Sequence, residues 1–288
     1  MSAETRLRIG ELSRRSGVSP DLLRAWERRY GLLRPSRSAG GLRLYSQDDL
    51  ARVQAMQQQL AAGVAAAEAA AAATTQATSA QSTHETASAR GELDAALLTF
   101  DDAKAHAVLD TLIARFSLDT VLSDVVLPYL HELGERWERG EVSVSQEHFA
   151  SALLRGRLLG LARGWGQGLG PTALLACAAG EQHDLGLIAF GLALRARGWR
   201  IVYLGPDTPL DSLADATEAT QPDVVVISAV DPERLTASRR GITALARGHR
   251  VAVGGAAASA VRFPDSVITL TGNPVSEAET LTPALRAS

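Results

Sequence analysis

Apolar residues recur at helical spacing near the start of the chain. They return every three or four positions in residues 9–17 and again in residues 20–30, which predicts two short helices. A glycine ends the first helix, and Ser19 precedes the second as a capping residue, with Pro20 in the first helical position. Two short helices joined by a tight turn form a helix-turn-helix pattern.

The next stretch predicts a wing on this helix-turn-helix. Two short extended runs flank Ser38–Gly41 and indicate a hairpin. Gln47–Leu60 then returns to helical spacing, with Ser46 as its capping residue. Apolar patterning stops in residues 61–90, where an alanine run gives way to TTQATSAQSTHETASA. We expect the alanines to extend the preceding helix and residues 76–91 to be a flexible linker.

Helical spacing resumes after the linker and continues to residue 168. The expected helices are Leu93–Phe100, Asp102–Phe116, Ser117–Gly140 and Ser145–Leu161. They suit a small antiparallel four-helix bundle.

The period changes again from Pro171, where short apolar runs alternate with helical ones. The expected strands are Ala173–Ala178, Arg200–Leu204, Asp223–Ser228, Val251–Val253 and Val267–Leu270. The expected helices between and after them are Leu185–Arg197, Leu210–Thr220, Pro232–Ala246 and Pro274–Leu285. This alternation predicts a flavodoxin-like, doubly wound α/β domain with a parallel sheet. The four expected parts are residues 1–75, 76–91, 92–168 and 169–288.

Composition and charge narrow the class of protein. No apolar run reaches the ~18 residues of a membrane span, and no signal peptide opens the chain, so we expect no membrane partner. The single cysteine, Cys177, forms no internal disulfide, which suits a cytoplasmic protein, and its apolar surroundings indicate a buried residue. Residues 1–60 hold 11 arginines against 6 acidic residues, whereas the whole chain has a net charge of −3. A basic head on an acidic body indicates that a polyanion meets the head.

Candidate chemistry gathers after the first predicted strand. His183 lies on a loop at the carboxyl edge of the sheet, where ligands of such folds bind. Imidazole is a common axial ligand of a metal in a tetrapyrrole ring, and Glu181 can orient its other nitrogen. Gly186 lets the next helix begin close to a bulky ligand. Ser228 and the pair Gly254 and Gly255 end later strands at the same edge and leave a slot with little side-chain bulk.

The head resembles the winged helix-turn-helix of MerR-type regulators. The signature runs from Ile9 to Tyr45 and includes Gly17-Val18-Ser19 and Trp26-Glu27-Arg28-Arg29-Tyr30. The resemblance implies that the second helix enters the major groove of promoter DNA and the wing contacts the backbone. The expected DNA-binding residues are Ser19, Arg24, Arg28, Arg37, Arg43 and Tyr45. Tyr45 has two open roles, packing or phosphate contact.

The α/β part is similar to the cobalamin-binding motif of flavodoxin-like corrinoid domains. The residues that carry the similarity are Glu181-x-His183-x-x-Gly186, Ser228, Gly254 and Gly255. That family typically has aspartate at the first position, where this chain has glutamate. The resemblance implies that His183 is the lower axial ligand of cobalt, in place of the cofactor's own base.

The bundle adds a tryptophan, nine residues and then Glu-His, at Trp137, Glu147 and His148. With the head and the corrinoid motif, it resembles the CarH/LitR group of light-dependent repressors. The resemblance implies that Trp137 and Val144 shape a pocket for the adenosyl group of adenosylcobalamin, which Glu147 and His148 contact. On the motif alone, Trp137 can equally be a core residue and Glu147-His148 an exposed pair.

The implied protein is a repressor and not an enzyme. Dark, adenosyl-bound protein assembles, as a homotetramer in the expectation drawn from the group, and light dissolves the assembly. In the light-sensing group the residue after the tryptophan is typically a histidine, whereas here it is Glu138, and His131 lies two turns earlier. Glu138 therefore keeps open a sensor of haem or another metal tetrapyrrole without photochemistry. A corrinoid methyl-carrier module is a further alternative, because the same pair of cap and sheet occurs there.

Overall fold

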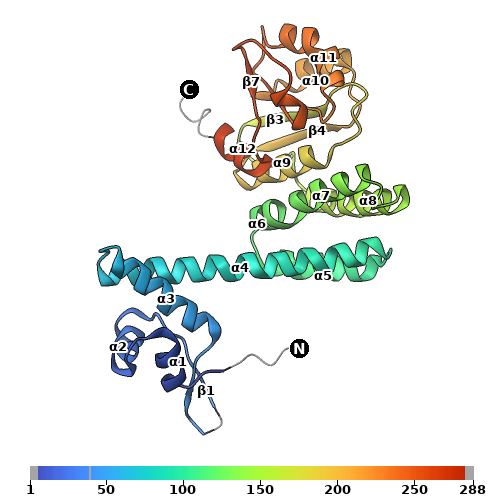
Figure 1. The fold of residues 1–288 in the computed structure, drawn as a ribbon. Coiled ribbons are helices and arrows are strands. Elements are labelled where there is room, and N and C mark those ends of the chain that lie inside the picture. Colours follow the sequence, from blue (N-terminus) through green and yellow to red (C-terminus); the bar gives the residue numbers. More distant parts are fainter. Residues whose placement is uncertain (1–5, 39, 283–288) are drawn as a thin grey trace. The chain divides into compact units, whose positions relative to one another are not determined.

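The computed structural model describes residues 6–38 and 40–282, and the chain forms two compact units, residues 1–88 and 89–288 (Figure 1). The first unit begins with the head. Its elements are α1 (Ile9–Ser16), α2 (Pro20–Tyr30), β1 (Ser36–Arg37), β2 (Arg43–Leu44) and α3 (Gln47–Ala61). The Ser19 hydroxyl caps α2 by accepting a hydrogen bond from the amide of Leu22 at 3.3 Å. Gly17 makes the turn between the helices with a φ of 72°, which glycine adopts without strain. The expected winged helix-turn-helix is therefore confirmed.

One buried carboxylate ties the wing to α3. Asp49 accepts hydrogen bonds from the amides of Ser46 and Arg34, each at 2.9 Å, and is paired with the guanidinium of Arg52. Arg52 also donates to the carbonyl of Leu32 at 2.8 Å. Because every oxygen of this carboxylate has a donor, its burial is compensated and it fixes the chain between α2 and β1.

Residues 76–91 correct one expectation, because they are helical within α4 (Ala66–Leu98). Alanine has the highest helix propensity, and the segment holds no proline. Its hydroxyl residues also bond within the helix: Thr78 and Thr83 donate to carbonyls four residues earlier, each at 2.9 Å. The lack of large apolar residues therefore did not make the segment irregular. The boundary between the two compact units falls inside it, after Ser88.

The helical cap follows in the second unit. Its elements after α4 are α5 (Asp102–Arg115), α6 (Leu118–Thr120), the π-helix η1 (Val121–Val126), α7 (Leu127–Glu138) and α8 (Val144–Leu161). The expected four-helix bundle is present, but the helix expected at Ser117–Gly140 contains a π-helical stretch. There the amide of Leu127 bonds the carbonyl of Leu122, five residues back. Pro128 follows and has no backbone N–H, so one hydrogen bond of the α-helix is missing at this point.

The remaining elements build the α/β domain. They are β3 (Thr172–Cys177), α9 (Leu185–Ala196), β4 (Arg200–Gly205), α10 (Leu210–Thr220), β5 (Val224–Ser228), α11 (Pro232–Leu245), β6 (Val251–Gly254), the 3-10 helix η2 (Ala256–Ser259), β7 (Val267–Thr269) and α12 (Pro274–Leu281). All strand pairs are parallel, in the order β4-β3-β5-β6-β7. This is the expected doubly wound sheet. The last three residues of the helix expected at 274–285 lie outside the described residues.

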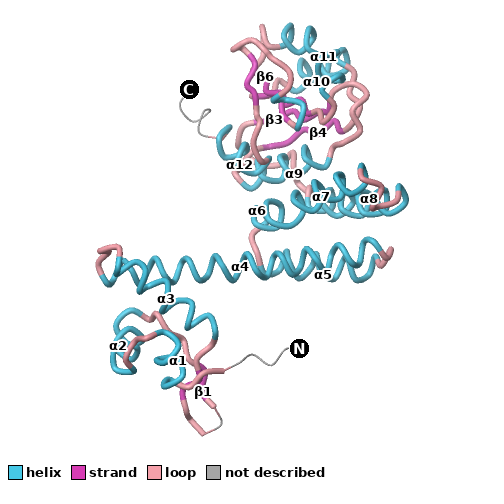
Figure 2. Tube along the Cα trace, in the orientation of Figure 1, coloured by secondary structure: helices cyan, strands magenta, loops and turns pink. Residues whose placement is uncertain are grey.

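The sheet separates two hydrophobic layers, as alternation along its buried strands requires. Leu175 and Cys177 of β3 face the layer that holds α9 and α12, whereas Leu174 and Ala176 face the layer of α10 and α11. Figure 2 shows these helices in cyan on either side of the magenta strands.

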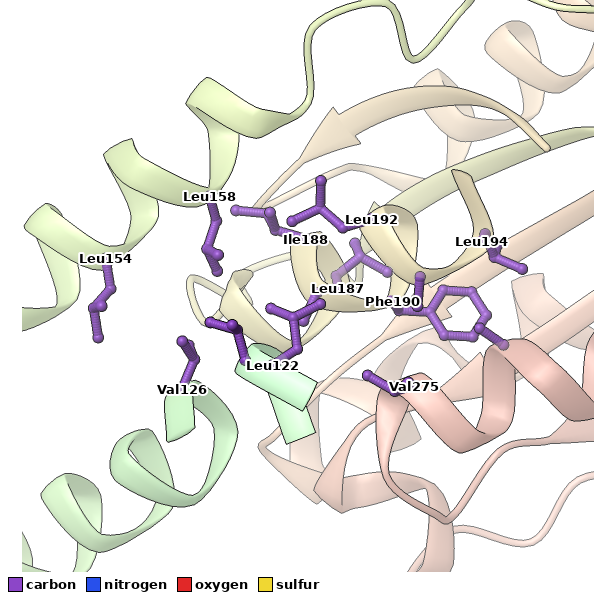
Figure 3. Packing of buried hydrophobic residues seen from close by; sticks show 14 of the residues in the cluster. Leu122, Val126, Leu154, Leu158, Leu187, Ile188, Phe190, Leu192, Leu194 and Val275 are labelled. Atoms are coloured by element: carbon purple, nitrogen blue, oxygen red, sulfur yellow. The ribbon is translucent and has the colours of Figure 1, made fainter. Parts of the chain in front are cut away.

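The cap packs on the α9 side of the sheet. Leu158 of α8 and Leu122 of η1 lie beside Leu187 and Ile188 of α9 (Figure 3). Leu154, one turn earlier on α8, belongs to the same buried cluster. All five are buried, so the cap and the α/β domain share one core. Among the described residues, no helix combines the length and apolarity needed to cross a bilayer.

Candidate cofactor and DNA-binding sites

The strand order creates a topological switch point between β3 and β5. The chain places β4 on one side of β3 and β5 on the other, so connections leave β3 and β5 in opposite directions. Ligands of open parallel sheets bind at this switch point, outside the carboxyl ends of the strands. Residues 178–184 follow β3 and residues 229–231 follow β5, and both segments lie at that edge.

The imidazole of His183 is exposed at this edge and held by a buried carboxylate. Its Nδ1 lies 2.6 Å from Oε1 of Glu181, and its side chain is 73% exposed. Glu181 is fully buried, and its Oε2 accepts hydrogen bonds from the amides of Val230 at 2.8 Å and Asp231 at 3.1 Å. With Nδ1 engaged, Nε2 is the ring nitrogen left to coordinate a metal.

Glu181 is ionised in this arrangement. Burial opposes its ionisation, but hydrogen bonds from the amides of His183, Asp231 and Val230, and from the His183 ring, outweigh burial. They lower the pKa of Glu181 to about 2. A carboxylate beside Nδ1 stabilises the tautomer that keeps its proton on that nitrogen, which leaves the lone pair of Nε2 free.

The surroundings of His183 offer apolar and Cβ-free surface. A methyl group on Gly186 would meet no atom within 4 Å, so space lies open beside the first turn of α9. Leu204, at the end of β4, is 37% exposed, and Val230, after β5, is 44% exposed. A single imidazole with a carboxylate behind it, next to open apolar surface, fits the lower face of a metal tetrapyrrole.

The other expected residues of this edge lie at the ends of β5 and β6. Ser228 is buried and pairs in register with Gly254. A Cβ at Gly255 would lie 2.3 Å from the carbonyl oxygen of Ala229 and 2.9 Å from Oγ of Ser228, and its φ is 88°. Gly255 is therefore required by the fold itself. At Gly254 a Cβ would meet only ordinary contacts at 3.8 Å.

One polar network at this edge was not expected from the sequence. Asp184, next to His183, is almost fully buried and accepts hydrogen bonds at Oδ2 from Arg155 of α8 at 2.7 Å and from the Tyr203 hydroxyl at 2.6 Å. Burial and the hydrogen bond to Asp184 raise the pKa of Tyr203, and the same carboxylate raises the pKa of Arg155. The three residues are 29 and 19 positions apart, and no local pattern links them.

The cap residues of the tryptophan motif are accessible rather than buried. Trp137 is 47% exposed and Val144 is 54% exposed, which disfavours a core role for Trp137. His148 is exposed, with Nε2 at 3.6 Å from Oε2 of Glu147. The Ser151 hydroxyl donates to Oε1 of Glu147 at 2.6 Å. The motif therefore presents two apolar and two polar side chains that a ligand can reach.

Glu138 and His131 both lie on α7. Glu138 is the last residue of the helix and is exposed. His131 is also exposed, with Nε2 at 3.4 Å from Oε1 of Glu135. Neither side chain is buried in the core.

The arginines expected to contact DNA are all exposed on the head. Arg28 on α2 and Arg37 on β1 lie on the surface, and Arg24 forms an exposed ion pair with Asp21 at 3.1 Å. Exposed guanidinium groups on a helix and a neighbouring wing provide the contacts that phosphates and guanine bases accept. Their contact with DNA stays a prediction.

Two wing residues are engaged within the head. Tyr45 is fully buried, and its hydroxyl donates to Oε2 of Glu27 at 3.0 Å. Burial and this carboxylate raise the pKa of Tyr45 to about 12. Arg43 donates to Oε1 of the same Glu27 at 3.0 Å. The burial favours the packing role for Tyr45, and Arg43 remains half-exposed.

Cys177 ends β3 beneath the His183 loop. Burial and the nearby carboxylates of Asp184 and Glu181 raise the pKa of its thiol to about 12. The thiol is thus protonated at neutral pH, as expected for a buried, unreactive cysteine.

Known families match the head, the helical cap and most of the α/β domain. The family described as "MerR HTH family regulatory protein" matches residues 7–75, and two families described as "B12 binding domain" match residues 90–159 and 171–263. The HTH-type transcriptional repressor CarH of Myxococcus xanthus is 35% identical over 89% of this chain and 91% of its own length. The repressor CarA of the same organism is 34% identical over 78% of this chain and 76% of its own length.

A solved structure supports the fold of the second unit. The monomethylamine corrinoid protein of Methanosarcina barkeri is 17% identical, with a TM-score of 0.53, over 67% of this chain and 96% of its own. At that identity the likeness concerns the fold alone. The curated relatives are named as transcriptional regulators and not as enzymes.

Proposed function

Because the chain belongs to the family of HTH-type transcriptional repressors that includes CarH and CarA, we propose that it is a DNA-binding repressor controlled by adenosylcobalamin and light. The observation that carries this proposal is the exposed His183 ring held by buried Glu181 at the sheet edge. It gives a cobalt ion a neutral nitrogen ligand of fixed orientation, on a chain that also carries a helix-turn-helix. The protein then acts in the cytoplasm, on promoter DNA.

The two faces of the cofactor meet different parts of the chain. His183 would hold the cobalt through Nε2, while Ser228, Gly254 and Gly255 would border the slot for the rest of the cofactor. Trp137 and Val144 of the cap provide apolar cover above, and Glu147 and His148 offer polar contacts for an adenosine. When bound, adenosylcobalamin supplies a cobalt–carbon bond that light can break.

Assembly links the cofactor to repression. A single head binds DNA modestly, whereas several tethered heads raise the effective concentration of each next contact. We propose that the dark, adenosyl-bound chain forms a tetramer that presents such a group of heads. Without an adenosyl group to contact, the cap side chains Trp137, Val144, Glu147 and His148 would be free to move. The assembly would then dissociate, and repression would end by mass action.

The test is the size and promoter binding of protein loaded with adenosylcobalamin, before and after green light. We expect a dark oligomer that binds DNA and dissociates on illumination. If illumination leaves the oligomer intact, the protein is not controlled by light. Absence of adenosylcobalamin uptake by the purified protein removes the cofactor as well.

Glu138 favours a second candidate, a sensor of haem or another metal tetrapyrrole without photochemistry. A carboxylate stands where the light-sensing group typically has a histidine, and Glu138 is exposed at the end of α7. The absorption spectrum of the purified protein separates the two candidates, because haem and cobalamins absorb at different wavelengths. We expect a cobalamin spectrum, and a haem spectrum would favour the second candidate.

A further inference from the structure

Arg155 connects the cap to the loop that carries His183. It lies on α8, and its guanidinium donates through Nε to Oδ2 of Asp184 at 2.7 Å. Tyr203, at the end region of β4, donates to the same oxygen at 2.6 Å. Cap, loop and sheet therefore meet at one carboxylate, whose side chain is only 3% exposed.

Such a contact is strong and specific. Hydrogen bonds from a guanidinium to a buried carboxylate are short and charge-assisted, and losing the donor leaves a buried charge without its partner. Asp184 directly precedes α9 and directly follows His183. A shift of Arg155 would therefore displace Asp184, which is the residue next to the proposed cobalt ligand His183.

The same face of α8 carries the proposed upper contacts. Glu147, Ser151 and Arg155 are spaced by four residues, so they lie in one row along the helix. The hydrogen bond from Ser151 to Glu147 confirms this alignment. Eight residues of helix set Glu147 about 12 Å along the axis from Arg155. The row thus runs from the residues proposed to contact the adenosyl group to the His183 loop.

His183 itself does not depend on Arg155. Its Nδ1 is held by Glu181, which is fixed by the amides of Val230 and Asp231. Loss of Arg155 therefore leaves the orientation of the imidazole in place while removing the polar tie between α8 and the loop.

We propose that Arg155 is a positioning residue that clamps the cap to the His183 loop and thereby sets the preference for the upper group of the cofactor. This inference rests on the proposed function and adds the residue that couples its two halves. The clamp fixes how far Glu147 stands above the lower ligand, so an upper group of adenosyl size is selected by geometry.

The test measures dissociation constants of adenosylcobalamin and hydroxocobalamin in the dark, for the full chain and its variants. We expect Arg155→Ala to lower the preference for adenosylcobalamin by about tenfold, the scale of one charge-assisted hydrogen bond. Hydroxocobalamin should bind within about threefold of wild type with an unchanged visible spectrum, because His183 still coordinates. Arg155→Lys, which keeps one donor, should restore most of the preference.

Arg157→Ala is the matched control. Arg157 lies on the same helix and is also ion-paired, but with Asp110 of α5 inside the cap. It should leave the ratio of the two dissociation constants unchanged. In ligand-free protein, amide hydrogen exchange of residues 178–185 should quicken in Arg155→Ala and not in Arg157→Ala.

The outcomes separate the two levels of the proposal. If the wild type prefers adenosylcobalamin and Arg155→Ala weakens both ligands equally, the clamp does not set the preference and the inference is overturned. The same holds if Arg157→Ala changes the ratio as much. If the wild type binds neither cobalamin, the proposed function fails and this inference fails with it.

Discussion

At the scale of single residues, glycines at one sheet edge serve different purposes. Gly186 faces open space, whereas a side chain at Gly255 would collide with the backbone of Ala229. The first position is available to a ligand, and the second belongs to the turn after β6. The sequence motif presents both simply as glycine, so their roles separate only when their surroundings are known.

Gly186→Ala should retain the fold and weaken cofactor binding. Alanine is favoured over glycine in a helix by up to ~1 kcal/mol, so the free energy of unfolding should stay equal or rise slightly. Its methyl group would occupy the space proposed for the cofactor, and cobalamin affinity should fall several-fold. Thermal unfolding without ligand and a cobalamin titration measure the two effects. Unchanged affinity would show that the ligand lies elsewhere.

Gly255→Ala should instead destabilise the ligand-free protein. The contact at 2.3 Å and the positive φ force the turn to move, at a cost of about 1–3 kcal/mol. Gly254→Ala, whose Cβ meets only ordinary contacts, is the matched control and should unfold close to wild type. Urea unfolding of both variants decides whether the two neighbouring glycines differ as expected.

Tyr45 gives the head an alkaline limit. Its pKa is raised to about 12, so the stability that its protonated form supplies is complete below the ordinary tyrosine value near 10 and is lost as pH rises through 12. Wild type should exceed Tyr45→Phe in stability at pH 8 and lose that advantage progressively between the ordinary tyrosine value and pH 12. Urea unfolding followed by circular dichroism at each pH measures the difference. A pH-independent difference would contradict the buried hydrogen bond to Glu27.

How far these residues could be predicted depends on the span of their contacts. Glu181 and His183 are two positions apart on one loop, and the sequence predicted their pairing. Asp184, Arg155 and Tyr203 come from a loop, a helix and a strand, and only the folded core brings them together. Tyr45 was left between two roles because its burial depends on packing against α2.

At the scale of elements, α8 shows how a local signal positions a site. Ser143 and Gln146 form a reciprocal capping box at its start, and Gln146 also donates to the carbonyl of Leu98 at 2.9 Å. These bonds fix the turn that carries Val144, Glu147 and His148. The start of the helix is therefore also the base of the proposed adenosyl pocket.

Ser143→Ala should destabilise the cap by about 1 kcal/mol, the usual cost of losing an N-cap hydroxyl. Adenosylcobalamin affinity should fall with it, because the first turn of α8 frays. Ser145→Ala, at an exposed position two residues on, is the control and should unfold like wild type. Urea unfolding of the ligand-free chain and a titration with adenosylcobalamin in the dark check both statements. Equal behaviour of the two variants would show that the N-cap hydrogen bond of Ser143 does not stabilise α8.

Element type was predicted well where periodicity is strong and poorly where composition misled. The buried strands and the helices of the head carry clear apolar periods. Residues 76–91 lack them and are nevertheless helical, because the alanines favour a helix whether or not a core covers them. The π-helix at Val121–Val126 could not be predicted from the sequence, because its four buried apolar residues also suit an α-helix.

At the scale of the whole molecule, the head and the rest of the chain carry net charges of opposite sign. The first 60 residues carry a charge of +5 and the rest of the chain −8, so attraction to a polyanion is confined to the head. This asymmetry was readable from the sequence alone. Binding to DNA should accordingly weaken steeply with salt.

Arg28→Ala should weaken promoter binding and reduce the slope of log affinity against log salt by about 0.9, the contribution of one phosphate contact. Arg239→Ala removes an exposed arginine from α11 and should leave the slope unchanged. Fluorescence anisotropy with promoter DNA at four salt concentrations measures both. Equal slopes for wild type and Arg28→Ala would remove that residue from the phosphate contacts.

The ends of the five-stranded sheet bear on how copies of this chain can join. The outermost strand β7 spans only Val267–Thr269, and on the opposite side the pairing of β4 shifts register beside Leu175 and Ala176. A short edge and an irregular one make poor templates for backbone pairing with another sheet. Both edges therefore disfavour open-ended sheet extension between copies of the protein. The assembly proposed above should accordingly use side-chain surfaces rather than backbone pairing.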